Sequence, residues 1–179
     1  DFSLEAIDKL KPDLIIGNKE ENDKTRIELL QQKYPVWISD INSLAEAKKM
    51  IAEIGQIVNK IQRADEILRN INTSFHQIKK RSSERVLYLI WRKPWMGAGA
   101  GTFIHDMLEQ LGFVNCLATV PRYPELSAND INLLKPEHIL LSSEPYPFKE
   151  KHRDELKNII SSSKINFVDG EMFSWYGSR

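Results

Sequence analysis

The sequence predicts an α/β protein with parallel sheets, and three observations lead to that prediction. Short apolar runs that suit buried strands alternate with segments whose apolar residues recur every three or four positions, as on one face of a helix. Capping residues and prolines mark where these segments begin and end. The chain has 179 residues, which is enough for one ordinary domain or for two small lobes.

Composition limits the classes of function. Lys plus Arg and Asp plus Glu each number 25, so the formal net charge is zero and we expect no nucleic-acid partner. The single cysteine, Cys116, excludes an intramolecular disulfide, and its apolar neighbours predict a buried structural thiol. No apolar run approaches the ~18 residues that a membrane-spanning helix needs.

Residues 1–42 predict two successive helix–strand pairs. Ser3 and Asp23 are each expected to begin a helix, because their side chains can accept the unpaired N–H groups of a first helical turn. The two strands are expected over residues 13–17 and 36–39, which are short apolar runs.

Residues 43–82 carry the strongest helical pattern. From Ile54 to Ile78 the apolar positions follow one another at alternating steps of three and four, which places them on one face of a continuous helix. The part from Asn59 to Arg81 alone would span roughly 35 Å. We expect this helix to be a backbone that joins two lobes. A coiled coil, which would make it the dimerisation element of a scaffold protein, is the competing interpretation.

Residues 83–179 return to alternating strands and helices. Leu134-Lys135-Pro136, before one strand, repeats the pattern Leu10-Lys11-Pro12 found before an earlier one, which indicates two related lobes. We therefore divide the chain into a remainder of an N-terminal lobe (1–42), an interlobe helical region (43–82) and a C-terminal lobe (83–179). The strands of the last part are expected over residues 85–91, 139–142 and 165–169, and its helices over about 102–111, 127–134 and 149–161.

No assembled catalytic centre is evident in the sequence. No two histidines have the spacing of metal ligands, and no serine stands in a nucleophile elbow. The glycine-rich segment 97–101 follows a strand and precedes a helix, but it lacks the third glycine of a dinucleotide fingerprint and the lysine of a phosphate loop. We predict a protein that is not an enzyme and has neither a resident cofactor nor a metal site. A cytosolic α/β enzyme that binds a phosphorylated ligand at 97–101 is the alternative of another class.

Aromatic and charged side chains gather in the loops that follow strands. Ligands of open α/β sheets sit at the carboxyl ends of strands, so these loops are expected to converge on one cleft. Flat aromatic rings with arginines and glutamates suit a large, partly planar ligand with a polar rim. The loops are residues 18–22, 92–96, 122–125, 143–148 and 171–179.

Three segments and the long helix resemble the helical-backbone metal-receptor class of substrate-binding proteins. The segments are residues 10–17 (LKPDLIIG), 122–127 (RYPELS) and 134–141 (LKPEHILL), and the similarity runs over essentially the whole chain. This class serves ABC importers of vitamin B12, ferric siderophores and haem. The resemblance implies two Rossmann-like lobes with parallel sheets joined by a long rigid backbone helix, with an incomplete first lobe.

Within this class the chain is most similar to vitamin B12-binding proteins, so the resemblance favours cobalamin as the metal-containing ligand. Asn18 departs from that subfamily, which has a tryptophan there, and the charged loop 18–22 keeps a ferric siderophore or haem as the alternative. The implied ligand contacts are Trp95, Tyr123, Phe173 and Trp175 as stacking or walling groups, Arg92 and Arg122 as polar anchors, and Asn18 at the first loop.

The resemblance also implies partners and a location. An ABC importer permease is the expected partner of a monomeric receptor, and Glu21 and Glu144 are the candidates for its docking contacts. Members of the class begin before Leu10-Lys11-Pro12 with further strands and end with a helix after Arg179. An export signal or lipid anchor is therefore expected in a preceding segment. It would place the protein in the periplasm or on the outer face of the cytoplasmic membrane.

Overall fold

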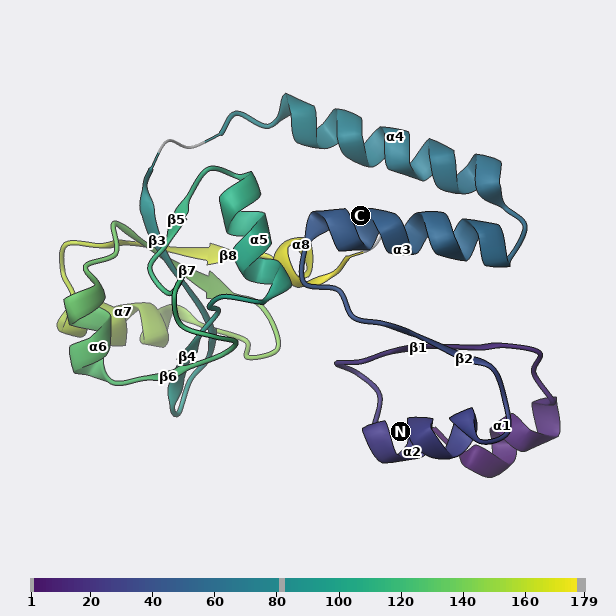
Figure 1. Cartoon of the computed structure of the whole chain (residues 1–179). Helices are drawn as coiled ribbons and strands as arrows, with labels where there is room; N and C mark the ends of the chain where they lie inside the picture. The colour runs from purple at the N-terminus through teal and green to yellow at the C-terminus, as the bar shows by residue number, and fades with distance from the viewer. Residues whose placement is uncertain (1, 81–82, 177–179) are drawn as a thin grey trace. The chain divides into compact units, whose positions relative to one another are not determined.

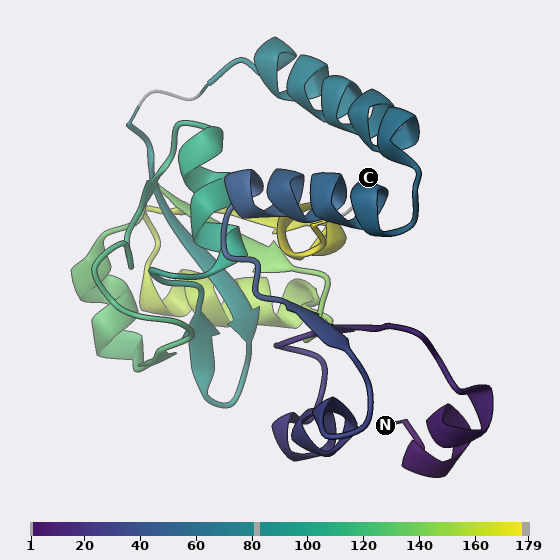
Figure 2. The ribbon, with the colours of Figure 1, turned by 45° about the vertical axis from the view of Figure 1, so that its right-hand side comes forward.

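A computed structural model describes residues 2–80 and 83–176, so the ends of the predicted regions 43–82 and 83–179 lie outside the described residues (Figures 1 and 2). The chain forms two compact units, Asp1–Ile41 and Asn42–Arg179. The helices are α1 (Leu4–Leu10), α2 (Lys24–Gln31), α3 (Leu44–Ile57), α4 (Ile61–Gln77), α5 (Phe103–Gln110), α6 (Ala128–Leu134), α7 (Glu150–Ile159) and α8 (Glu171–Ser174). The strands are β1 (Ile15–Asn18), β2 (Val36–Ser39), β3 (Arg85–Trp91), β4 (Trp95–Gly97), β5 (Val114–Asn115), β6 (Glu125–Leu126), β7 (His138–Ser142) and β8 (Lys164–Val168).

The first unit contains the two helix–strand pairs that the sequence predicts. Strands β1 and β2 pair in parallel, with Ile15 opposite Val36. Ser3 Oγ accepts the N–H three residues further on at 3.3 Å and caps α1, and Asp23 Oδ1 caps α2 in the same way at 2.9 Å. The unpaired N–H groups of both first turns are thus satisfied locally, which is why the capping signals located these helices correctly.

The two Leu-Lys-Pro segments end their helices in the same way. Lys11 after α1 and Lys135 after α6 are both in the left-handed conformation, with φ of 48° and 45°. In each case the following proline cannot continue the helix, and the chain proceeds into a strand that pairs in parallel. The repeated Leu-Lys-Pro pattern therefore corresponds to a repeated structural element, as expected of related lobes.

The helical region of the second unit is a pair of antiparallel helices, which corrects the prediction of one continuous helix from Ile54 to Ile78 (Figures 1 and 2). The break lies at residues 58–60, where Asn59 takes a left-handed φ of 53°. Helices α3 and α4 then pack so closely that a Cβ on Gly55 would lie 2.4 Å from Ala64 Cβ. The long helix of this region is α4 alone, about 25 Å long at 1.5 Å per residue.

The apolar stripe is therefore shared between two helices of one chain. Asparagine tolerates the left-handed conformation better than most residues, so a helix can end there without a glycine. The periodicity survives the break because both helices turn their apolar sides toward each other. Ala64 is buried, and Ile67, Leu68, Ile71 and Phe75 of α4 are half-buried.

A six-stranded sheet forms the centre of the second unit. Its strand order is β6-β4-β3-β7-β8, and β5 pairs with the beginning of β3. Strands β5, β3, β7 and β8 are parallel, whereas β4 and β6 are antiparallel additions at one edge. Of the parallel strands, β3, β7 and β8 correspond to the predicted ones, and β5 was not predicted. Residues 95–97 were expected to lie in the loop 92–96 and in the glycine-rich segment that follows it. The ladder to Leu89 and Trp91 makes them a strand instead.

The two faces of this sheet carry separate hydrophobic clusters, because side chains alternate between the faces along β3. Leu87 and Leu89 point to one cluster, which α6 and α7 cover, and Val86 and Tyr88 point to the other, which α5 and α8 cover (Figure 1). Helix α3 lies against α5. Cys116 is half-buried beside the first cluster, and burial raises the pKa of its thiol.

The glycine-rich segment is bound to the protein's own backbone. The N–H groups of Gly97 and Gly99 donate to the carbonyl oxygens of Pro124 and Arg122, at 3.1 and 2.8 Å. Between and after them, Ala98 and Ala100 donate to carbonyls of Tyr88 and Val120. Since these four N–H groups are already paired, they are not available to cradle a phosphate, as the alternative enzyme hypothesis requires. Instead, the glycines allow residues 97–100 to lie close to residues 120–124 of the same chain.

His152 links the start of α7 to the aromatic rings of Tyr146 and Phe148. Its Nδ1 accepts the backbone N–H of Lys149 at 2.9 Å, and its Nε2 lies 3.1 Å from the hydroxyl of Tyr146. The ring is 5% exposed, and burial lowers the pKa of His152 below its ordinary 6.5, with Lys151 and Arg92 acting in the same direction. The neutral ring is therefore the form that the fold accommodates.

We predict that the free energy of unfolding falls as the pH is lowered from about 7 to about 5. The unfolded chain protonates His152 near its ordinary pKa and so binds more protons than the folded chain in this range. Chemical denaturation at a series of pH values measures the slope. The variant His152→Gln is expected to flatten it, whereas His76→Gln, at an exposed position on α4, keeps it. Equal slopes in the parent and His152→Gln would contradict the prediction.

Candidate ligand-binding surface

The loops after β7 and β8 meet at the carboxyl ends of these strands. Ser143 Oγ accepts the backbone N–H of Gly170 at 2.9 Å, which ties the second loop to the first. Gly170 is buried, and a Cβ there would lie 2.4 Å from Ser142 Oγ and 2.6 Å from Glu144 Cγ. Only a glycine lets the two loops approach this closely, so α8 begins directly against the loop that holds Glu144.

Glu144 anchors the end of α8. Its Oε1 accepts hydrogen bonds from Trp175 Nε1 at 2.7 Å and from Ser174 Oγ at 3.0 Å. The carboxylate is half-buried, whereas the indole of Trp175 is 56% exposed. A large aromatic ring is thus displayed to solvent while its only polar atom is bound to the protein.

Phe173 and Tyr123 pack on the same hydrophobic cluster, around Tyr88. The rings of Tyr88 and Phe173 are 5.1 Å apart and tilted by 51°, and Tyr123 is half-buried against the cluster. Burial raises the pKa of Tyr88 well above its ordinary range, so its phenol remains neutral and donates to Ser142 Oγ at 3.1 Å. The structure therefore brings two predicted contact residues, Tyr123 and Phe173, to one side of the sheet.

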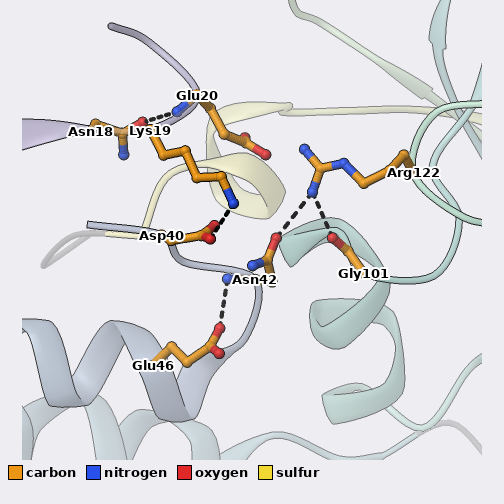
Figure 3. A network of polar contacts seen from close by, with 8 residues as sticks. All are labelled: Asn18, Lys19, Glu20, Asp40, Asn42, Glu46, Gly101 and Arg122. Atoms are coloured by element: carbon orange, nitrogen blue, oxygen red, sulfur yellow. Dashed lines mark hydrogen bonds and ion pairs between the residues drawn. The ribbon is translucent and has the colours of Figure 1, made fainter. Parts of the chain in front are cut away.

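Arg122 lies next to Tyr123 at the exposed rim of this side. It takes a left-handed φ of 57°, and its Nη1 donates to Gly101 O at 2.7 Å and to Asn42 Oδ1 at 3.1 Å (Figure 3). The guanidinium carbon is 5.3 Å from the centre of the Tyr123 ring. The cation is thus held in place beside an aromatic ring, an arrangement that can receive an anionic or π-electron-rich ligand group.

Trp95 belongs to the cluster on the opposite face of the sheet, and Arg92 lies beside it. Trp95 is 4% exposed and stacks on Phe148 with ring centres 6.1 Å apart. The Arg92 guanidinium lies 4.3 Å from the Trp95 ring and forms a two-nitrogen ion pair with Glu155, whose pKa it lowers by hydrogen bonding. The structure does not bring this pair together with Tyr123 and Phe173. Both side chains have partners of their own in or beside the core.

Asn18 organises the loop after β1 in the first unit. Its Oδ1 accepts the backbone N–H of Glu20 at 2.8 Å (Figure 3). The same oxygen accepts the N–H of Glu21 at 3.1 Å, and Nδ2 donates to Ser39 Oγ at 3.3 Å. Lys19 forms an ion pair with Asp40 in the same unit. Asn18 therefore shapes the loop, and Glu21 is one of the side chains that the loop exposes.

Three further residues, for which the sequence predicts no role, support this surface. Asn42 holds the guanidinium of Arg122, while Ser174 and Gly170 fix α8 against the loop of Glu144. Gly170 alone had a visible signal, since it stands between a strand and an aromatic segment. The roles of Asn42 and Ser174 depend on partners about 80 and 30 residues away, which no local pattern reveals.

In residues 2–80 and 83–176 no group of three or more His, Cys, Asp or Glu side chains is placed to hold a metal ion. Across the same residues, no helix combines the length and apolar character needed to cross a membrane.

Comparisons with known proteins give one family and many solved structures. The model of a family described as periplasmic binding protein matches residues 1–165. Comparison with curated proteins gives no match. Several solved structures have the same fold at identities that support a likeness of fold alone.

Three of these structures illustrate the range of ligands that the descriptions of the similar proteins name. A possible iron-binding, periplasmic solute-binding protein of Staphylococcus epidermidis has a TM-score of 0.79 at 23% identity, over 100% of this chain and 76% of its own. A periplasmic haem-binding protein of Roseiflexus sp. RS-1 has a TM-score of 0.80 at 20% identity, over 100% and 75%. The periplasmic vitamin B12-binding protein of Vibrio cholerae has a TM-score of 0.71 at 18% identity, over 99% and 73%.

The family model covers far more than half of the chain, and the parallel sheets, the echoed Leu-Lys-Pro elements and the solved structures agree with it. The α/β class predicted from the sequence is confirmed, and so is the resemblance to receptors of vitamin B12, haem and iron complexes. This chain therefore belongs to the periplasmic binding protein family, whose members are two-lobed substrate-binding components of ABC importers and not enzymes.

Proposed function

We propose that this chain binds a metal-containing ligand outside the cytoplasm and delivers it to the permease of an ABC importer. The observation that supports this proposal most is the set of aromatic side chains on one side of the second unit's sheet. Tyr123 and Phe173 pack on one cluster there, and Trp175 presents an exposed indole. Aromatic side chains suit the flat face of a macrocycle, because they supply a large contact area at little cost in conformational entropy.

Cobalamin and haem are the two favoured ligands. The resemblance to vitamin B12-binding proteins and the aromatic side chains favour a corrinoid. Arg122, held beside Tyr123 at the rim, favours haem, because a guanidinium pairs well with the carboxylates of haem propionate groups. A ferric siderophore is the third possibility and is a separate arm of the test.

The test is titration of the purified protein with cyanocobalamin, hemin and ferric siderophores, followed by tryptophan fluorescence and by calorimetry. We expect saturable one-to-one binding of a ligand from one of these three classes. Trp175→Ala should weaken it about thirtyfold or more, because truncation of a central aromatic contact typically costs about 2 kcal/mol or more. Trp91→Phe is the matched control, since Trp91 packs on Tyr146 at the end of β3 and keeps an aromatic ring in the variant. If none of the three classes binds, the proposed ligand class is wrong.

Glu21 is the proposed docking contact of the first unit with the permease. Its exposed position in a loop ordered by Asn18 supports this role, because an exposed carboxylate can meet a basic group of the permease without rearrangement. Ligand uptake by the assembled importer tests it, since a docking residue changes uptake at unchanged ligand affinity. An unchanged uptake rate in Glu21→Gln would remove Glu21 from this role.

A further inference from the structure

The contact between Glu144 and Trp175 joins two loops that are 31 residues apart in sequence. The carboxylate belongs to the loop after β7, and both of its donors, Trp175 Nε1 and Ser174 Oγ, lie at the end of α8. The backbone on each side is fixed independently. Ser142 Oγ donates to Glu144 O at 2.5 Å, and the N–H of Trp175 donates to Glu171 O at 3.1 Å.

An exposed tryptophan at the end of a four-residue helix is expected to sample several rotamers unless something holds its ring. A hydrogen bond from the indole N–H to a carboxylate is charge-assisted, and so it is stronger than one between neutral groups. Fixing the ring before the ligand arrives removes an entropic cost from binding. Glu144 therefore stands where it can preorganise the most exposed aromatic side chain of the proposed surface.

We propose that Glu144 is a positioning residue that sets the orientation of Trp175 for ligand binding. The inference rests on the proposed function of Trp175 and gives Glu144 a different role from the permease docking that the resemblance implies. The distinction is chemical. Docking needs the negative charge of the side chain, whereas positioning needs an oxygen that accepts the indole N–H.

Two substitutions separate these roles. Glu144→Gln removes the charge but keeps an acceptor oxygen on a side chain of similar size, and Glu144→Ala removes the acceptor itself. Glu150→Ala is the matched control, because Glu150 is an exposed carboxylate at the start of α7 that pairs with Arg153. Circular dichroism and chemical denaturation select variants that are folded.

The first measurement needs no ligand. The emission of Trp175 is obtained in each background as the difference between the protein and its Trp175→Phe derivative, and its quenching by iodide and its anisotropy are recorded. We expect Glu144→Ala to raise the quenching about twofold and to lower the anisotropy, because the ring becomes mobile. Glu144→Gln should lie between Glu144→Ala and the parent. Unchanged quenching and anisotropy in Glu144→Ala would overturn the proposal.

The second measurement is the affinity for cyanocobalamin and hemin. For whichever of them binds, we expect Glu144→Ala to weaken binding about tenfold and Glu144→Gln about threefold or less. In the Trp175→Phe background, which has no indole N–H, Glu144→Ala should have no further effect, as in a coupled double-mutant cycle. An equal loss from Glu144→Ala in both backgrounds would overturn the proposal.

The two measurements keep this inference and the proposed function apart. A change in Trp175 emission without binding of either probe would uphold the positioning of Trp175 and remove corrinoids and haem from the proposed function. Normal emission and normal affinity in both Glu144 variants, together with a loss of uptake by the importer, would instead assign Glu144 to docking and overturn the positioning role.

Discussion

Replacing Trp95 by alanine is expected to lower the free energy of unfolding of the second unit by about 3–5 kcal/mol, the usual cost of deleting a buried aromatic side chain. Trp95 is 4% exposed and fills the cluster that contains Leu117, Ile131 and Leu156, stacked on Phe148. The substitution also removes the ring over which the Arg92 guanidinium lies. Denaturation by urea, followed by far-ultraviolet circular dichroism, measures the change.

Trp175→Ala is the matched comparison, because both variants remove one indole. Trp175 is 56% exposed, so its loss should cost about 1 kcal/mol, mainly through the hydrogen bond to Glu144. A fall in ligand binding would then have different causes in the two variants. In Trp95→Ala it would follow from loss of folded protein, and in Trp175→Ala from a lost contact. Similar stabilities of the two variants would show that Trp95 is not part of the core.

Replacing Gly99 by alanine is expected to destabilise the second unit by about 3–5 kcal/mol, which combines overpacking with the loss of two hydrogen bonds. A Cβ at Gly99 would lie 2.1 Å from Val120 O and 3.1 Å from Arg122 O, and both atoms are backbone. Neither can move aside by a rotamer change. The segment 97–100 would have to separate from residues 120–124, and Arg122 would shift with it. Thermal unfolding should therefore show a large fall in Tm.

Gly101→Ala is the control for this substitution. Gly101 has a φ of +71°, but no atom lies within 4 Å of a Cβ placed there. The substitution should cost only about 1 kcal/mol, because an L-residue in the left-handed region is strained without a steric clash. Equal destabilisation by Gly99→Ala and Gly101→Ala would show that backbone conformation, and not close packing, explains the glycines of this segment.

The glycine-rich segment shows how a sequence pattern can identify special positions and still leave their purpose open. Glycines leave room for a ligand or another chain segment to lie close to the backbone, and a close approach does occur here. The partner is residues 120–124 of the same chain. Glycines in a sequence indicate positions that have little room for a side chain. Which chain segment packs against them depends on contacts between residues some 20 positions apart, which the local sequence does not reveal.

The sequence by itself determined the α/β class, the positions of the principal parallel strands and the starts of helices at Ser3, Asp23 and Ser127. These features depend on local physics, namely apolar periodicity and the hydrogen bonding of a first helical turn. Only the tertiary structure decided that Trp95 lies in the core while Trp175 faces solvent, and that residues 44–77 form two packed helices. Burial is set by which distant segments pack together, so residues of one type in similar loops can have opposite surroundings.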